Sequence, residues 1–405
     1  MTTTASVHAL PLASDSRPAC RLCGERAHFL GNHLGEAHGL TLAAYDAEFP
    51  GAPTASDEVV AAFDASLKGV RRRAAPAARD LSVTLAGVPV PVWAGVKGTD
   101  CLPLPPAYKW ASKGHLKKDI TEAVISVLRG RHTYIWGMPG TGKDAFVHGI
   151  SQQARRPAII LSIVPGRDIG PWFYTRSVSK EGTGWEYGTG WRAVTEGYTA
   201  PDGSKHPYIV LVTDLDRADE AQVEWLRLLM DGIAGRIIGP DGKTVPVFPG
   251  TTFVATANTA GGGDERGRMV SARPMDASIL DRFQRKFRFH YMEWADEEEI
   301  VRAKFPLLCE KAPEMFTQMG NATAAIRDAV EKETLYAEFS HRGVCAVLGH
   351  AEDVLSVTGK AQDGLLKRAF RAWLDGLPDE STRLEARRLI DPHLKGGSFD
   401  DEAGV

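Results

Sequence analysis

The chain has 405 residues, 43% of them hydrophobic, which is enough for two or three globular domains with their own cores. Its net charge of −3 gives no overall attraction to nucleic acid or to a membrane, so such a partner would need a local basic patch. No secretory signal opens the sequence and no run of about 18 apolar residues occurs in it, so we expect a cytoplasmic protein with no membrane partner. The 5 cysteines are few for a disulfide framework, and two of them form a close pair that suits a metal site.

The close cysteine pair is followed by two histidines at the spacing of a zinc site. The pattern C-x2-C-x9-H-x4-H places two thiolates on a short turn and two imidazoles about one turn apart on a helix, a set that suits tetrahedral Zn²⁺. The expected ligands are Cys20, Cys23, His33 and His38. We interpret His28 as a loop histidine rather than a spare ligand.

Residues beyond the histidines extend this pattern. The sequence HGLT at 38–41, followed by Tyr45 and Pro50, makes residues 18–53 similar to the bacterial Ros/MucR-type zinc fingers. The resemblance implies a small zinc-binding domain, which we place at residues 1–53, and a contact with DNA or with protein through it.

Residues 54–105 are expected to form a linker and a small β element. An amphipathic segment at 59–67 precedes a basic run at 68–73, which is either a solvated face or a contact with phosphates beside the finger. The partly alternating stretch at 81–92 predicts the β element, whose role the sequence does not reveal.

A phosphate-binding loop lies between a predicted strand at 133–136 and a predicted helix at 145–153. Its glycines let backbone N–H groups face phosphate oxygens, its lysine reaches the β and γ phosphates, and the next residue normally supplies a hydroxyl to Mg²⁺. Here that residue is an aspartate. The sequence therefore predicts binding of ATP and Mg²⁺ by Gly137, Pro139, Gly140, Thr141, Gly142, Lys143 and Asp144.

Three further strands, at 158–163, 208–212 and 252–258, are expected after the loop. A carboxylate at the end of such a strand faces the phosphate loop, where it organises Mg²⁺ or polarises the attacking water. An amide at the end of the next strand holds that water, and an arginine after a helix reaches the nucleotide of a neighbouring subunit. The residues expected in these places, with a second arginine that follows Ser340, are Asp214, Asn258, Arg282 and Arg342.

This series resembles the AAA+ ATPases of the MoxR-like group, and especially the ATPase subunit of aerobic cobaltochelatase. The similarity is carried by FVATANTAGGGD at 253–264 and MDASILDRF at 275–283, and it extends over about residues 105–392. It implies an α/β fold, with an AAA+ parallel-sheet P-loop domain at 106–293 and a helical lid domain at 294–405.

The resemblance also implies roles and partners. Lys143 would be the Walker A lysine, Asn258 the first sensor, Arg282 the arginine finger and Arg342 the second sensor. The assembly implied is a homo-oligomeric, hexameric ring that works with a von Willebrand-type protein. Two β-hairpins typical of the group are expected at 172–187 and 236–247.

Two departures from the family pattern bear on activity. Asp144 replaces the hydroxyl that binds magnesium, and the third strand lacks the usual Asp-Glu pair. In one register Thr213 takes the metal place and Asp214 the water-polarising place; in the other Asp214 binds metal and Leu215 stands where the base should be. Asp214 matters in both registers, and Asp216 is a weaker candidate. Weak hydrolysis is therefore a serious alternative.

Two functions from different classes remain open. In the first, the protein is an ATP-driven ring that remodels a protein or protein–nucleic acid partner, with the zinc finger as adaptor. In the second, nucleotide binding only fixes an assembly that hydrolyses poorly, or a DNA-binding scaffold such as a transcription regulator. An ATPase assay with and without candidate partners separates them.

Overall fold

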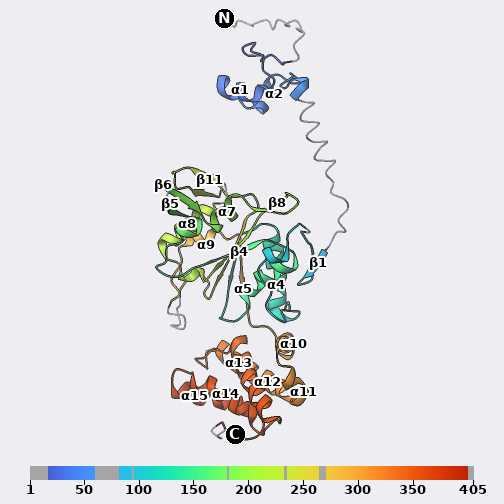
Figure 1. Cartoon of the computed structure of the whole chain (residues 1–405), viewed down its shortest axis with the longest axis vertical. Helices are drawn as coiled ribbons and strands as arrows, with labels where there is room; N and C mark the ends of the chain where they lie inside the picture. Colours follow the sequence, from blue (N-terminus) through green and yellow to red (C-terminus); the bar gives the residue numbers. More distant parts are fainter. Residues whose placement is uncertain are drawn as a thin grey trace. The chain divides into compact units, whose positions relative to one another are not determined.

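The computed structural model describes residues 17–59, 82–93, 95–179, 182–231, 235–263 and 271–399. They belong to two compact units, Met1–Arg79 and Asp80–Val405 (Figure 1). The basic run at 68–73 and all but the first residue of the amphipathic segment at 59–67 lie outside the described residues. Among the helices that are described, none combines the length and apolar character that crossing a bilayer requires.

The first unit is built on two short helices, α1 (Leu30–His38) and α2 (Leu42–Glu48). Gly39 ends α1 in the left-handed conformation, with φ 63°, and its N–H donates to the carbonyl of Leu34. Thr41 then caps α2 by accepting a hydrogen bond from the N–H of Ala44. A small core of Cys20, Leu30, Leu34 and Tyr45 holds the unit together. Backbone pairing of Leu30 with Thr54 extends these contacts past residue 53.

The second unit contains a five-stranded sheet in the order β13-β3-β12-β9-β4, and all of its pairs are parallel. The strands are β3 (Thr133–Trp136), β4 (Ala158–Ser162), β9 (Ile209–Thr213), β12 (Thr252–Ala257) and β13 (Arg285–Arg288). Numbered along the chain, this order is 5-1-4-3-2, with the strand before the phosphate loop inside the parallel sheet, as expected of a P-loop domain. The predicted fold class is thereby confirmed.

Alternate residues of the central strands enter two separate cores, because successive side chains of a strand point to opposite faces. Ile135 and Leu211 pack on one face against α4 (Gly114–Leu128) and α5 (Lys143–Gln153). Tyr134 and Val210 pack on the other face, which is covered by α7, α8 and α9. These three helices span Thr189–Thr195, Glu220–Leu229 and Ala277–Asp281. Burial on both faces explains why the predicted strands read as continuous apolar runs.

The expected small β elements are present as separate antiparallel hairpins. They are β1–β2 (Ser82–Leu85 and Val88–Pro91), β5–β6 (Tyr174–Ser179 and Gly182–Tyr187) and β10–β11 (Arg236–Ile238 and Thr244–Pro246). A fourth pair, β7–β8 (Tyr198–Thr199 and Lys205–His206), is very short. The helix α6 (Gly170–Phe173) precedes β5, and single helical turns lie at η1 (Gly98–Asp100) and η2 (Leu215–Arg217).

The remainder of the described chain is a helical domain with its own core, as the sequence predicts (Figure 1). Its helices are α10 (Trp294–Lys304), α11 (Pro306–Lys311), α12 (Glu314–Glu331), α13 (His341–Thr358), α14 (Leu365–Asp375) and α15 (Glu380–Ile390), followed by the turn η3 (Asp391–His393). Asp296 in α10 joins this domain to the segment before α4. Its buried carboxylate accepts hydrogen bonds from the N–H and hydroxyl of Ser112 and from the N–H of Lys113, at 2.6, 2.5 and 3.0 Å.

Candidate functional site

The phosphate loop connects the carboxyl end of β3 to the first turn of α5, so the positive end of this helix faces the loop. Two of its glycines leave no room for a side chain. A Cβ on Gly137 would lie 2.2 Å from the carbonyl oxygen of Phe289, and one on Gly140 would lie 2.6 Å from the Cβ of Ser340. Gly140 also has φ 74°, a left-handed conformation that glycine adopts without strain. The loop is thus shaped by its glycines and closely packed.

The side chain of Lys143 is buried and folds back on its own loop. Its Nζ donates hydrogen bonds to the carbonyls of Gly137 and Met138, at 2.7 and 3.0 Å, and to the amide oxygen of Asn258, at 3.2 Å. Burial lowers the pKa of Lys143 to about 8, although neighbouring carboxylates oppose this shift. A phosphate group would give the ammonium a stronger partner than these neutral carbonyls.

Asp144 points toward the sheet and contacts the neighbouring strand β12. Its Oδ1 accepts a hydrogen bond from the hydroxyl of Thr256, at 2.7 Å. Thr256 is buried and lies two residues before Asn258. The site therefore does contain a hydroxyl beside the loop, but it comes from a strand and is bonded to the carboxylate. Sequence reasoning missed Thr256; its separation of two residues from Asn258 is the signal that places both on one side of a strand.

Asp214 follows directly on β9 and is half-buried in the left-handed conformation, with φ 55°. Such a conformation in a residue other than glycine is uncommon and is enriched at functional sites. Burial raises the pKa of Asp214, and the negative charge of Asp144 adds to the effect. The two carboxylates therefore lie close enough to repel each other, an arrangement that a divalent cation would relieve.

Asp216 is the weaker candidate for binding the metal or polarising the attacking water. It is 1% exposed, and its carboxylate accepts hydrogen bonds from backbone N–H groups. Its Oδ2 accepts hydrogen bonds from the N–H groups of Asn258 and Thr259, at 2.9 and 3.0 Å. Leu215, between the two aspartates, is fully buried in the core. Asp216 thus fixes the backbone that presents the Asn258 amide, a positioning role that sequence reasoning missed.

The helical domain supplies further groups at the loop. Tyr291, just before α10, donates its hydroxyl hydrogen to the carbonyl of Pro139, at 3.2 Å. Ser340 and His341 begin α13 against Gly140. Burial is the main cause of the lowered pKa of Lys143, and the positive charge of the exposed Arg342 adds to it, so the predicted second sensor lies near the predicted Walker A lysine.

Arg282, the predicted arginine finger, follows α9. Its backbone N–H ends that helix by donating to the carbonyl of Ile279, and its Nε is buried with no hydrogen-bond partner in the described part of the chain. Among the described residues, none of the side-chain hydrogen bonds of Lys143, Asp144 or Asn258 involves Arg282. The structure therefore brings Lys143, Asp144, Asp214, Asn258 and Arg342 together, and it does not add Arg282 to this set.

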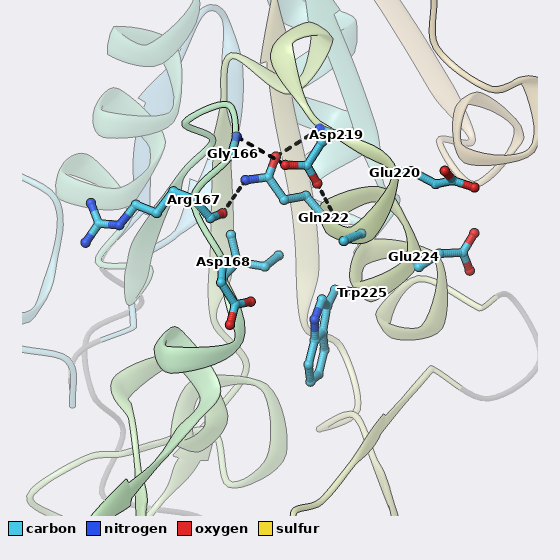
Figure 2. A pocket seen from close by; sticks show the side chains of 10 residues that line it. Gly166, Arg167, Asp168, Asp219, Glu220, Gln222, Glu224 and Trp225 are labelled. Atoms are coloured by element: carbon cyan, nitrogen blue, oxygen red, sulfur yellow. Dashed lines mark hydrogen bonds between the residues drawn. The ribbon is translucent and has the colours of Figure 1, made fainter.

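A surface cavity of about 690 Å³ lies away from this cluster, between the segment after β4 and the start of α8 (Figure 2). Asp219 and Gln222 form a capping box at the start of α8, and Gln222 also donates to the carbonyl of Arg167, at 2.7 Å. Figure 2 shows the guanidinium of Arg167 turned away from the carboxylates of Asp219 and Glu220. These polar contacts build the fold locally, and the cavity contains none of the predicted site residues.

The four predicted zinc ligands converge in the first unit. Their ligand atoms all lie within 4.8 Å of one another. Sulfur–nitrogen distances are 3.2 Å for Cys23–His33, 3.4 Å for Cys23–His38 and 3.6 Å for Cys20–His38. With Zn–S of about 2.3 Å and Zn–N of about 2.0 Å, a tetrahedral ion separates such ligands by about 3.5 Å. The residues present therefore fit Zn²⁺.

Outer contacts orient the metal cluster. The Nδ1 of His33 lies 3.2 Å from a carboxylate oxygen of Glu25, which leaves Nε2 for the ion. His28 lies elsewhere, with Nδ1 3.0 Å from the hydroxyl of Ser56. It is not a member of the metal cluster, in agreement with the sequence interpretation.

No protein-family model matches the chain, and no curated protein matches it. Among solved structures, a RuvB mutant from Thermotoga maritima is 13% identical with a TM-score of 0.45, over 69% of this chain and 77% of that chain. Another, RuvB described as the Holliday junction branch migration motor of Thermotoga maritima, is 12% identical with a TM-score of 0.41, over 65% of this chain and 70% of that chain. The fold class rests instead on the strand order of the parallel sheet and on the helical domain after it.

We predict that the purified protein carries one Zn²⁺ per chain and that Cys23→Ser removes it. Small zinc domains derive their folding free energy from the ion, so the variant should lose the structure of the first unit and keep that of the second. Elemental analysis and limited proteolysis measure both effects. His28→Gln, outside the cluster, should retain the metal. Wild-type protein that contains no zinc when prepared without chelator would disprove the prediction.

We predict that nucleotide affinity falls as the pH rises above about 8, since burial lowers the pKa of Lys143 to about 8 and only its ammonium attracts phosphate. The limiting slope for losing one proton is about tenfold in affinity per pH unit. Titration calorimetry with ATP and Mg²⁺ between pH 7 and about 9.5 tests this linkage. Lys143→Arg keeps its charge over that range, so its weaker binding should not follow this slope. A flat wild-type profile would contradict the assignment, and Lys143→Ala should lose most of the affinity.

Proposed function

We propose that the protein is an AAA+ ATPase that forms a nucleotide-dependent ring and remodels a protein or protein–nucleic acid partner. The observation that carries this proposal is the convergence of charged and amide groups at the carboxyl edge of the sheet. They come from the phosphate loop, from the ends of two strands and from the helical domain: Lys143, Asp144, Asp214, Asn258 and Arg342. Two cations and an amide suit a triphosphate, and two carboxylates suit its divalent cation.

Each of these groups has a place in phosphoryl transfer. Lys143 would hold the β and γ phosphates, and Arg342 would meet the γ phosphate from the helical domain. Asn258 would orient the attacking water, because Asp216 fixes the backbone at that amide. Asp144 and Asp214 would hold Mg²⁺, which neutralises charge on the phosphates when bound. The negative charge that they place beside the triphosphate is balanced only in the presence of that ion.

The ring, its partner and the adaptor role of the zinc-binding unit are part of the proposal. Arg282 is half-buried at the end of α9, and among the described residues its guanidinium has no ion pair, which leaves its charge for the nucleotide of a neighbouring subunit. The Cys/His unit is compact by itself, as an adaptor for protein or DNA would be. A von Willebrand-type protein remains the expected partner by family resemblance.

A second function, an assembly that binds nucleotide and hydrolyses it poorly, is favoured by one observation. The residue after Asp214 is Leu215, whose side chain is fully buried and has no acid–base chemistry. The carboxylates whose charges act on Lys143 belong to Asp144, Asp214 and Asp216. All three are aspartates, whose side chains are one methylene shorter than that of glutamate. A base that reaches the attacking water less well than a glutamate slows hydrolysis without weakening binding.

We predict that Asp144→Thr raises the Mg²⁺-dependent affinity for ATP by about threefold to tenfold, which corresponds to up to about 1.4 kcal/mol. The change restores a hydroxyl at the metal and removes a negative charge beside the phosphates, while Thr256 keeps a hydroxyl as partner. Asp144→Ala, which lacks any ligand, is the matched control. Steady-state ATPase assays and calorimetry give turnover and affinity. The unmodified protein should turn over slowly at most; rapid basal turnover that falls in Asp144→Thr would show instead an adapted, fully active site.

We predict that Arg282→Ala leaves ATP binding nearly intact and abolishes hydrolysis that depends on assembly. Its guanidinium would meet charge on the nucleotide of the adjacent subunit, so its loss acts in trans. Binding is measured by calorimetry, and hydrolysis is measured as a function of protein concentration. A protein that stays monomeric at micromolar concentration with ATP bound would exclude this role.

A mixing experiment sharpens the test of action in trans. Lys143→Ala and Arg282→Ala should each be inactive alone. Mixed in equal amounts, they should restore activity at about a quarter of the interfaces, because a functional site then combines the intact lysine of one subunit with the intact arginine of the next. No recovery in mixed rings of confirmed composition would show that Arg282 acts within its own subunit or not at all.

A further inference from the structure

Three titratable side chains gather around one thiol at the start of α13, next to the nucleotide site. The Sγ of Cys345 lies 3.4 Å from the Nε2 of His341, one turn earlier on the same helix. The Nζ of Lys304, from α10, lies 3.5 Å from the same sulfur. The other ring nitrogen of His341, Nδ1, lies 2.9 Å from the carboxylate of Glu297. The Nζ of Lys304 also lies 3.0 Å from the Nε2 of His341, so the amine, the imidazole and the sulfur contact one another and two basic groups share one sulfur.

Glu297 stabilises the protonated form of His341, whereas the nearby amine of Lys304 opposes it. Glu297 is 2% exposed and pairs with both nitrogens of the Arg327 guanidinium, at 2.6 and 3.1 Å. Burial disfavours the imidazolium, but the hydrogen bonds with Cys345 and Glu297 outweigh it and raise the pKa of His341 to about 9. Lys304 is exposed, so the cluster opens to solvent on its side.

The same contacts favour the thiolate. Burial opposes ionisation of Cys345, yet the hydrogen bond and charge of His341, with the charge of Lys304, lower the pKa of its thiol. Cys309, on α11 of the same domain, has other partners: its thiol donates a hydrogen bond to the carbonyl of Arg302, at 3.4 Å, and its sulfur lies 4.0 Å from the Arg302 guanidinium. Cys309 therefore offers a second thiol of the same domain with which the reactivity of Cys345 can be compared.

We propose that Cys345 is a modification site that exchanges with low-molecular-weight disulfides, with His341 and Lys304 as the groups that hold its thiolate. The Cys345 sulfur attacks one sulfur of the disulfide, a mixed disulfide forms, and the bond between the two sulfurs of the reagent breaks. The second half leaves as a thiolate with that electron pair, and His341 is placed to protonate it. The reagent is itself the oxidant, so no other co-reactant is consumed.

The position of the thiol gives the exchange a consequence, which rests on the proposed nucleotide function. Ser340 and His341 lie directly against Gly140 of the phosphate loop, and Arg342 follows them. A mixed disulfide at Cys345 removes the thiolate charge that His341 and Lys304 share. It also adds a bulky group one helical turn from the contact between His341 and Gly140. The adduct at Cys345 is therefore expected to weaken nucleotide binding severalfold.

Zinc-loaded, full-length protein is incubated with oxidised glutathione at pH 7, and the adducts are located by peptide mass spectrometry. Cys345 should be modified at least about tenfold faster than Cys309, in line with a larger thiolate fraction. A rate at Cys345 equal to that at Cys309, or below it, would overturn the proposal.

The dependence of the rate on pH separates electrostatic activation from simple accessibility. His341→Gln should slow the reaction at pH 6.5 by about threefold to tenfold and move the midpoint of the rate profile to higher pH. Lys304→Gln, at an exposed position, should do the same to a smaller extent even if His341→Gln folds poorly. A midpoint that neither variant moves would show that these groups do not hold the thiolate.

The consequence is tested with the same material. ATP affinity is compared between reduced protein and protein carrying the adduct at Cys345, with Cys345→Ser as the variant that oxidised glutathione should not affect. Unchanged affinity at full modification would overturn the coupling to the nucleotide. Absence of the adduct would overturn the site itself, whatever the protein does with ATP.

Discussion

The buried carboxylate of Asp216 is the contact on which the nucleotide edge of the sheet depends. Through one oxygen it accepts the N–H groups of Asn258 and Thr259, and so it ties the end of β9 to the end of β12. A buried carboxylate is costly unless hydrogen bonds compensate it, so both strand ends are held in the one geometry that supplies those bonds. Asn258 owes its orientation to this arrangement, and Lys143 in turn bonds to Asn258. The site is therefore organised before any ligand arrives.

The sequence predicts four of the five sheet strands, because each is a largely apolar run; β3, β9 and β12 are buried on both faces, whereas β4 exposes Ile160 at the edge of the sheet. It does not predict β13, whose residues Arg285–Arg288 are charged at three of four positions and bury only Phe287 at the edge of the sheet. The candidate site divides in the same way. Residues at strand ends and in the phosphate loop can be read from spacing, since parallel strands end at one edge. The pairing of Asp144 with Thr256 cannot, because it depends on which strand lies beside α5.

That pairing changes the meaning of the altered loop. A hydroxyl is present at this edge of the sheet, but it belongs to β12 and donates its hydrogen to the carboxylate that replaced the usual ligand. The hydroxyl of Thr256 and the carboxylate of Asp144 are therefore coupled. A substitution at Asp144 changes the charge beside the loop and also removes the hydrogen-bond acceptor of Thr256. Attenuated hydrolysis and tight, cation-dependent binding are compatible in such a site, because binding needs charge balance whereas hydrolysis also needs a well-placed base.

The hydrogen bonds of Asp296 have a mechanical consequence. The helical domain is joined covalently to the sheet domain at the segment before α10, and Asp296 anchors it a second time, to Ser112 and Lys113 before α4. Two attachment points close together define an axis, whereas one covalent link alone would leave the domain free to swing in any direction. Displacement of α13 by a nucleotide would therefore be converted into rotation about that axis. Such a hinge gives Ser340 and His341 a single path toward or away from Gly140 of the phosphate loop.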